Sequence, residues 1–187
     1  KTVAIIDDRT AYGQGLADEF EKGAAAAGAK VVTREFTNDK ATDFAAILTK
    51  IKSKKADVIF YGGMDAQGGP MVKQMKSLGV KAKYLSGDGS CTPEFIKLAG
   101  PASEGQYASL PGVPLDQMPG GKAFGDAFTA KYGPIQLYAP YVYDAVMVMA
   151  DAMKRANSVD AAKYLPEIGK TDYQGVSAKI QFDDKGD

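Results

Sequence analysis

Short apolar segments alternate with longer amphipathic segments through the first 110 residues. The apolar segments begin near residues 3, 31, 57 and 84, and most of them end in glycine or in polar residues. Between the first two, Leu16, Phe20 and Ala24 recur at the spacing of one helix face, and Gly28 marks the end of that helix. This rhythm predicts an α/β fold: a three-layer, doubly wound, mostly parallel sheet with helices on both faces.

The same pattern sets the expected bounds of each element in this first part. We expect five strands, over 3–6, 31–36, 57–61, 84–85 and 106–110. We also expect four helices: one over 13–27, one that begins at about residue 42, one that includes Met71 to Leu78, and one over 93–100. Thr92 is a suitable N-cap for the last of these helices, and Pro93 suits its first position.

The character of the chain changes after residue 110. Two segments rich in proline and glycine, 111–114 and 119–121, form a linker. We then expect helices over 122–131, 139–156 and about 160–168, followed by a strand over 178–182. We therefore divide the chain into 1–113 and 114–187, and the second part lacks most of a sheet of its own. The helix over 139–156 carries an apolar stripe, expected to be core or interface, made of Tyr141, Ala145, Val146, Met149 and Met153.

Composition excludes several classes of function. Lys and Arg number 23, as do Asp and Glu, and this balance argues against nucleic acid as the main partner. The lysines of 50–55 fit the end of a helix, where they complement its dipole. No run approaches the roughly 20 apolar residues of a membrane span. The absence of histidine removes histidine-dependent triads and the commonest metal ligand, and Cys91 has no partner for a disulfide within the chain. We expect a small packed role for Cys91.

Three loops fall at the carboxyl ends of the expected strands, where doubly wound sheets bind ligands. They are Asp7-Asp8, Gly62-Gly63 and Gly87-Asp88-Gly89. The glycines beside Asp88 leave bare backbone, so a small ligand can approach, and a carboxylate suits the ammonium group of a zwitterion. A turn aspartate that caps backbone is an equally open interpretation. Tyr12 lies at the same edge, either as a pocket wall or as a surface tyrosine.

Other candidate motifs are weaker. The Asp7-Asp8 pair is similar to the acidic pair of a phospho-receiver domain. The chain lacks the aspartate at the end of the third strand and the lysine at the end of the fifth that such a domain also needs. We therefore expect a solvated pair that caps a turn. Residues 13–18 approach a dinucleotide fingerprint, but Asp18 replaces the third glycine, so we expect only a helix start.

Several stretches together carry a family likeness: 3–8, 12–17, 43–48, 57–63, 78–81, the Asp88 loop, 98–100 and 182–187. In their order and spacing the chain resembles the periplasmic branched-chain amino acid (Leu/Ile/Val) binding proteins of bacterial ABC transporters, a type I periplasmic binding protein family. The resemblance implies two α/β lobes joined by a three-segment hinge, with the ligand held between them. Residues 1–113 would be most of the second lobe, and 114–187 would return to an incomplete first lobe.

The resemblance also implies roles for four residues. Asp88 matches the acidic position that pairs with the α-amino group of the ligand, where the type member has glutamate. Tyr12 matches the tyrosine that lines the second-lobe side of the pocket, and Tyr138 matches an aromatic residue near the hinge, for which core packing is the alternative. Met64 departs from the family, because the type member is aromatic there, and gives a more adaptable wall.

The expected function is therefore solute binding without catalysis, cofactor or metal. The protein would bind a branched-chain or similar aliphatic amino acid in the periplasm and present it to an inner-membrane permease. We expect the chain to be a segment of a longer protein, because it opens directly on a strand. The resemblance implies that the precursor has a signal peptide. On its own, it could self-associate through its apolar helix face. A ligand-sensing domain of a receptor or regulator, and a metal-dependent enzyme using Asp7, Asp8 and Asp88, are the alternatives.

Overall fold

The computed structural model describes residues 1–186 of the chain and contains two compact units, which we describe separately. Unit 1 is Lys1–Pro111 and unit 2 is Gly112–Asp187. Their boundary lies two residues before the division expected from the sequence. No helix in the described part of the chain is long and apolar enough to cross a membrane.

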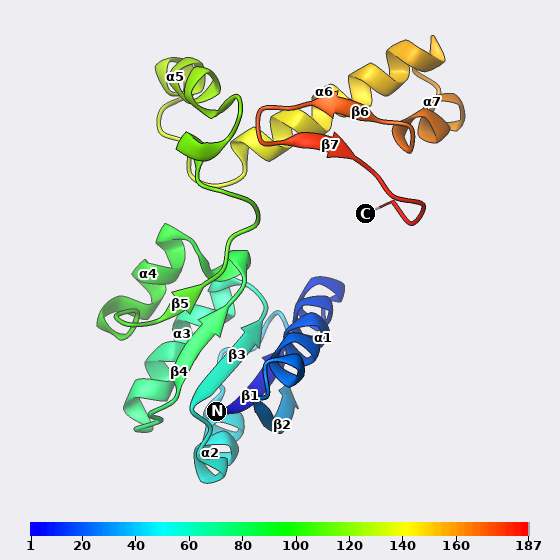
Figure 1. The fold of residues 1–187 in the computed structure, drawn as a ribbon. Coiled ribbons are helices and arrows are strands. Elements are labelled where there is room, and N and C mark those ends of the chain that lie inside the picture. Colours follow the sequence, from blue (N-terminus) through cyan, green and yellow to red (C-terminus); the bar gives the residue numbers. More distant parts are fainter. Residues whose placement is uncertain (187) are drawn as a thin grey trace. The chain divides into compact units, whose positions relative to one another are not determined.

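Unit 1 is a parallel sheet in the strand order β2-β1-β3-β4-β5, with helices on both faces (Figure 1). This arrangement confirms the predicted α/β class. Its strands are β1 (Thr2–Asp7), β2 (Lys30–Phe36), β3 (Val58–Gly62), β4 (Lys83–Ser86) and β5 (Tyr107–Ala108). Its helices are α1 (Ala11–Ala26), α2 (Ala45–Lys54), α3 (Asp65–Ser77) and α4 (Pro93–Ala99), with the short 3₁₀ turns η1 (Asp88–Ser90) and η2 (Gly100–Ala102).

The alternation of side chains along the strands divides the core into two clusters. On one face, Ile5 and Phe60 pack against α1, and the ring of Phe20 stacks on Phe60 with a centroid separation of 4.1 Å. On the other face, Ile6 and Tyr61 belong to a larger cluster built with α2, α3 and α4. Leu48 of α2 and Met71 of α3 are fully buried in that cluster.

Capping side chains fix where the helices begin. The Thr92 hydroxyl accepts a hydrogen bond from the backbone N–H of Phe95, and Pro93 follows it, as the sequence predicted. Helix α1 begins two residues before the expected position, because the Thr10 hydroxyl caps it by accepting from Gly13 N. Helix α2 ends in lysines, as expected.

Strand β5 is shorter than predicted. We expected residues 106–110, but only Tyr107 and Ala108 form the strand. The side-chain oxygen of Gln106 accepts a hydrogen bond from Tyr84 N. It takes the place that a backbone carbonyl oxygen would have in a longer β5 strand. β5 therefore forms a short outer edge of the sheet.

Unit 2 consists of helices and one small hairpin. The elements are η3 (Leu115–Gln117), α5 (Gly121–Tyr132), α6 (Ala139–Ala156), α7 (Ala161–Ile168), β6 (Asp172–Gln174) and β7 (Lys179–Gln181). The three helices lie close to their predicted bounds. Strands β6 and β7 pair antiparallel, and β6 was not predicted.

Helix α6 buries a different face from the apolar stripe. Its buried residues are Pro140, Asp144, Val148 and Ala152, whereas Val146 in the predicted stripe is 59% exposed. The Asp144 carboxylate accepts hydrogen bonds from the backbone N–H groups of the turn between β6 and β7, both at 2.8 Å, and from the hydroxyl of Ser177. A charged residue therefore fastens the hairpin to α6.

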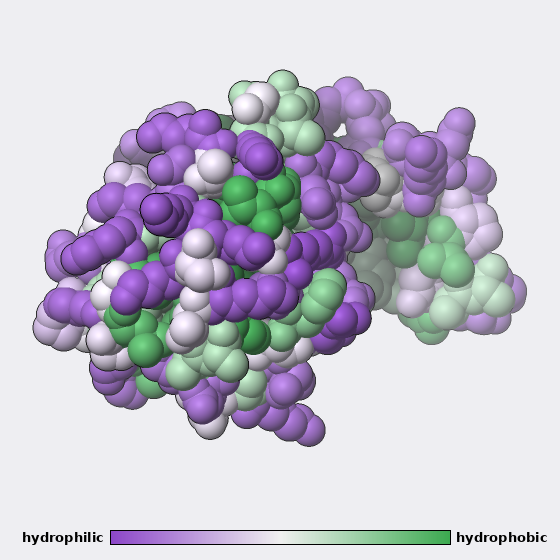
Figure 2. All heavy atoms as spheres, turned by 90° about the horizontal axis from the view of Figure 1, so that it is seen from below, coloured by the Kyte–Doolittle hydropathy of each residue, from purple (hydrophilic) through white to green (hydrophobic). Residues whose placement is uncertain are grey.

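Figure 2 shows one face of the molecule, on which hydrophilic residues predominate and apolar residues form small, separate patches.

Candidate functional site

The carboxyl ends of β1, β3 and β4 bring three loops to one edge of the unit 1 sheet. In the strand register Asp7 lies beside Gly62, and Tyr61 lies beside Ser86. The residues that follow these strands therefore meet at the same edge, as the sequence pattern predicted. We call this edge, with Tyr12, Met64 and the loop 87–89, the rim.

Tyr12 and Asp88 are in direct contact at the rim. The Tyr12 hydroxyl donates a hydrogen bond to Asp88 Oδ1 at 2.8 Å and accepts one from Gly89 N at 3.0 Å. Burial, with the neighbouring Asp88 carboxylate, raises the pKa of Tyr12 to about 12. The hydroxyl is therefore protonated at neutral pH and acts as a donor to the carboxylate.

Met64 lies against the same loop. A Cβ atom added at Gly89 would lie 2.8 Å from Met64 Sδ and 2.9 Å from the Tyr12 hydroxyl, and one added at Gly87 would lie 2.7 Å from Leu16 Cδ1. Side chains of the protein itself therefore pack closely against both glycines, and the Cβ position at Gly89 also lies 2.9 Å from the backbone carbonyl oxygen of Gly63. Tyr12 and Met64 remain 36% and 47% exposed, so the rim is open.

Two further contacts hold the Asp88 loop. The buried Tyr84 hydroxyl lies 3.1 Å from Ser90 Oγ, which ties the loop to β4. The Thr92 hydroxyl donates to Asp65 Oδ2 at 2.5 Å, which ties the start of α4 to the start of α3. The sequence predicted Thr92 only as a helix cap. No sequence signal identified Asp65 or Ser90: Asp65 acts through a partner 27 residues away, and Ser90 through the hydroxyl of a tyrosine on the preceding strand.

Asp7 and Asp8 are buried, which corrects the expectation of a solvated pair. Asp7 is fully buried and forms an ion pair with Arg34 at 3.1 Å. Asp8 is 2% exposed, and its Oδ1 accepts from both the N–H and the hydroxyl of Thr10. The predicted turn cap is therefore present at Asp8. The described residues contain no group of three or more His, Cys, Asp or Glu side chains that could hold a metal ion.

The residues that resembled a dinucleotide fingerprint form a helix start. A Cβ atom at Gly13 would lie 2.1 Å from Asp8 Oδ1 and 2.5 Å from the carbonyl oxygen of Gly62, so glycine there permits close approach of α1 to the sheet. Asp18 pairs with Arg34 at 2.6 Å.

Tyr138 lies in unit 2, at the residue before α6. It is 41% exposed. The structure thus brings together three of the four predicted site residues, Tyr12, Met64 and Asp88, and places the fourth in the other unit.

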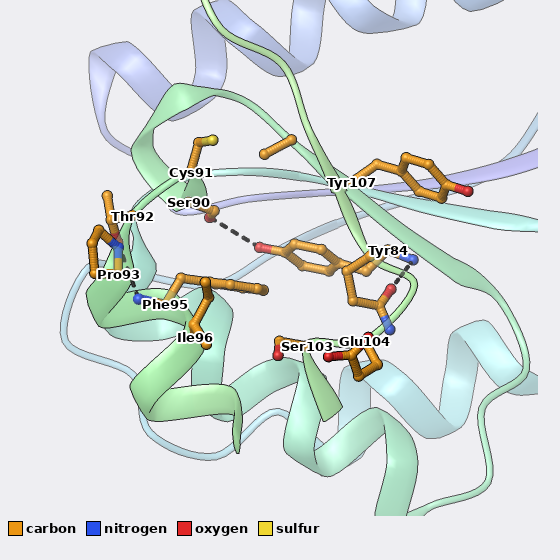
Figure 3. A pocket seen from close by; sticks show the side chains of 12 residues that line it. Tyr84, Ser90, Cys91, Thr92, Pro93, Phe95, Ile96, Ser103, Glu104 and Tyr107 are labelled. Atoms are coloured by element: carbon orange, nitrogen blue, oxygen red, sulfur yellow. Dashed lines mark hydrogen bonds between the residues drawn. The ribbon is translucent and has the colours of Figure 1, made fainter. Parts of the chain in front are cut away.

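A separate hollow of about 450 Å³ lies between α4 and β5 (Figure 3). Tyr84, Cys91, Ile96 and Tyr107 are among its lining residues, and the Tyr84 ring points its hydroxyl toward Ser90 in Figure 3. None of the four predicted site residues lines it. Cys91 is partly exposed on its wall rather than packed in the core.

Comparison with known proteins places this geometry in a family. A family model described as periplasmic binding protein matches residues 1–187. A leucine-, isoleucine-, valine-, threonine-, and alanine-binding protein of Pseudomonas aeruginosa is 33% identical over 188 residues, which cover 100% of this chain and 50% of the relative. A Leu/Ile/Val-binding protein homolog of Brucella suis is 35% identical over 188 residues, covering 99% of this chain and 50% of the relative.

Solved structures agree with these relatives. A leucine-binding protein of Thermotoga maritima has a TM-score of 0.88 and 32% identity, covering 100% of this chain and 54% of that chain. A branched-chain amino acid transporter substrate-binding protein of Streptococcus pneumoniae, in complex with isoleucine, has a TM-score of 0.80 and 28% identity. The match covers 99% of this chain and 53% of that chain. The chain thus spans about half the length of the curated relatives it matches. The family likeness expected from the sequence is confirmed, and the chain belongs to the periplasmic binding protein family.

Proposed function

We propose that the protein is the solute-binding component of an amino acid ABC transporter and binds a branched-chain or similar aliphatic amino acid. The observation that carries the proposal is the Tyr12–Asp88 hydrogen bond at the open rim, with Met64 beside it. The names of the relatives, which describe binding of leucine, isoleucine and valine, support the ligand class.

Asp88 is the proposed partner of the ligand's ammonium group. Burying a charged group is costly unless it meets a hydrogen-bonded partner of opposite charge, and hydrogen bonds between ions are the stronger ones. Tyr12 and the anchored loop hold the carboxylate in a fixed place, so less ordering is needed when the ligand arrives. The Tyr12 ring and the Met64 thioether supply apolar surface for an aliphatic side chain.

The two units fit different parts of a two-lobed protein. In this proposal unit 1 is most of one lobe, and unit 2, with Tyr138, is part of the other. Asp88 then supplies one half of a clamp, and the α-carboxylate of the ligand is held by the part of the relatives' length that this chain does not span. A ligand that contacts both lobes stabilises the closed form, which a membrane permease would recognise in the periplasm.

For the chain on its own, we propose self-association through the outer face of α6. Val142 and Val146 are each 59% exposed and Met149 is 42% exposed on this helix. Light scattering of the isolated chain should show a dimer that Val146→Lys weakens. A monomer at all concentrations would contradict this part of the proposal.

The function is tested by a thermal-shift screen of the full-length protein. Leucine, isoleucine and valine should raise the melting temperature, since a ligand at 100 times its Kd adds about 2.7 kcal/mol to stability. The desamino acid 4-methylpentanoate should give a much smaller shift. Equal shifts with leucine and 4-methylpentanoate, or no shift with any amino acid, would contradict the proposal. A ligand-sensing domain would use the same site and give the same thermal shifts. Uptake of the amino acid that depends on the permease distinguishes a transport component from a sensor.

A further inference from the structure

Two buried polar atoms lie beneath the rim without a hydrogen-bond partner among the described residues. They are Asp8 Oδ2 and the Tyr61 hydroxyl. Asp8 is 2% exposed and Tyr61 is fully buried. Buried polar side-chain atoms are hydrogen-bonded in the large majority of cases, either to protein or to ordered water. Each of these atoms therefore requires a partner.

Asp8 and Tyr61 lie at the ends of two neighbouring strands, β1 and β3. Ile6 lies beside Tyr61 in the β1–β3 register, and both belong to the larger core cluster. Asp8 directly follows β1, and its carboxylate is among the charges that act on the Tyr61 hydroxyl. Asp8 N also donates to the carbonyl oxygen of Gly62 at 3.0 Å, which joins the ends of the two strands.

The Tyr61 hydroxyl reaches the loop after β3. A Cβ atom added at Gly63 would lie 2.3 Å from this hydroxyl oxygen. The hydroxyl is therefore close to the chain beside Asp8, at the base of the loop that carries Met64. Burial, together with nearby charges that include Asp8, raises the pKa of Tyr61 well above its ordinary value. It therefore remains a protonated donor.

One of the two atoms is a hydrogen-bond acceptor and the other is a donor. Asp8 Oδ1 already accepts two hydrogen bonds from Thr10, so Oδ2 is the oxygen that still needs a donor. The Tyr61 hydroxyl needs an acceptor for its proton. A water molecule can accept from the hydroxyl and donate to the carboxylate at once. A cation could contact both oxygens but would leave the tyrosine proton without an acceptor.

We propose that a buried water molecule bridges the Tyr61 hydroxyl and Asp8 Oδ2. The bridge joins the end of β3 to the turn that starts α1. It thereby supports two parts of the rim from below: Tyr12 on α1 and Met64 after β3. The inference rests on the geometry of unit 1 and does not depend on the identity of the ligand.

A crystal structure of the protein tests this directly. It should show a density peak within roughly 2.6–3.2 Å of both oxygen atoms. In Tyr61→Phe crystals the peak should be lost or strongly reduced. Tyr84→Phe is the matched control, because Tyr84 is a buried tyrosine on the neighbouring strand whose hydroxyl already contacts Ser90. The peak should be unchanged in that variant.

Three results would overturn the proposal. One is a direct hydrogen bond between Tyr61 and Asp8 in the wild-type crystal with no density between them. Another is an anomalous signal at the site after rubidium soaking, which would identify a cation. The third is a peak of undiminished occupancy in Tyr61→Phe. The wild-type crystal alone decides the first two, so the test holds even if Tyr61→Phe fails to fold.

Discussion

Replacing Tyr12 with phenylalanine removes one hydroxyl group and leaves the ring in place. That hydroxyl makes two hydrogen bonds, to Asp88 Oδ1 at 2.8 Å and from Gly89 N at 3.0 Å. A hydrogen bond to a charged group contributes about 1.5–3 kcal/mol, and one between neutral groups contributes about 0.5–1.5 kcal/mol. Tyr12 is 36% exposed, so water replaces part of what is lost, and the lower ends of these ranges apply. The sum is about 2 kcal/mol.

Both bonds exist before the ligand arrives, so part of this loss lowers the stability of the loop and the rest weakens binding, because the carboxylate that meets the ammonium group is no longer held in place. We expect the Kd for leucine to rise about tenfold or more, since tenfold corresponds to about 1.4 kcal/mol. Isothermal titration calorimetry of the full-length protein measures it. Tyr107→Phe is the control, because Tyr107 is 61% exposed in the same unit and lies outside the rim. A Tyr12→Phe protein whose Kd stays within twofold of wild type would refute the reasoning.

Gly89→Ala should weaken leucine binding, because the added methyl group would lie 2.8 Å from Met64 Sδ. Gly23→Ala is the control and should not weaken it, because a methyl group there meets nothing within 4 Å. Equal Kd values for the two variants in calorimetry would contradict this. Tyr12 should titrate near pH 12 rather than 10.0, owing to burial and a neighbouring carboxylate. Because its folded pKa is raised, its contribution to stability is complete below pH 10.0 and is lost as the pH rises toward about 12. NMR of ¹³C-labelled tyrosine checks the titration, and an ordinary pKa would count against the Tyr12 contact. Asp144→Asn should lower the free energy of unfolding of the chain by about 2 kcal/mol or more, because the amide NH2 that replaces one carboxylate oxygen then faces one of the two N–H groups of the hairpin turn. Urea denaturation measures the change, and an unaltered midpoint would show that the carboxylate does not hold the hairpin.

Local patterns predicted the framework of unit 1. Alternating apolar segments identify strands and helices because burial follows the backbone period, and the Thr92-Pro93 start is visible within a few residues. Since the strands are parallel, the prediction that Tyr12 and Asp88 lie at one edge needed only their positions after strand ends. The hydrogen bond between them bears out that they are neighbours, whereas their role toward a ligand stays a proposal.

The errors arose from contacts between residues far apart in the sequence. Asp7 was expected in solvent, but Arg34, 27 residues away, allows it to be buried. Asp144 occupies a core position of α6 because its partners lie 32 and 33 residues later, and this moved the buried face away from the apolar stripe. Strand β6 has no apolar run and is defined only by pairing with β7.

The role of Asp88 is tested most directly by calorimetry of Asp88→Ala in the full-length protein, with leucine and with 4-methylpentanoate. The account predicts at least a tenfold rise in the Kd for leucine, on the order of 1.4 kcal/mol, with little change for the analogue that has no ammonium group. An unchanged Kd for leucine would contradict the assignment of Asp88 as the ammonium partner.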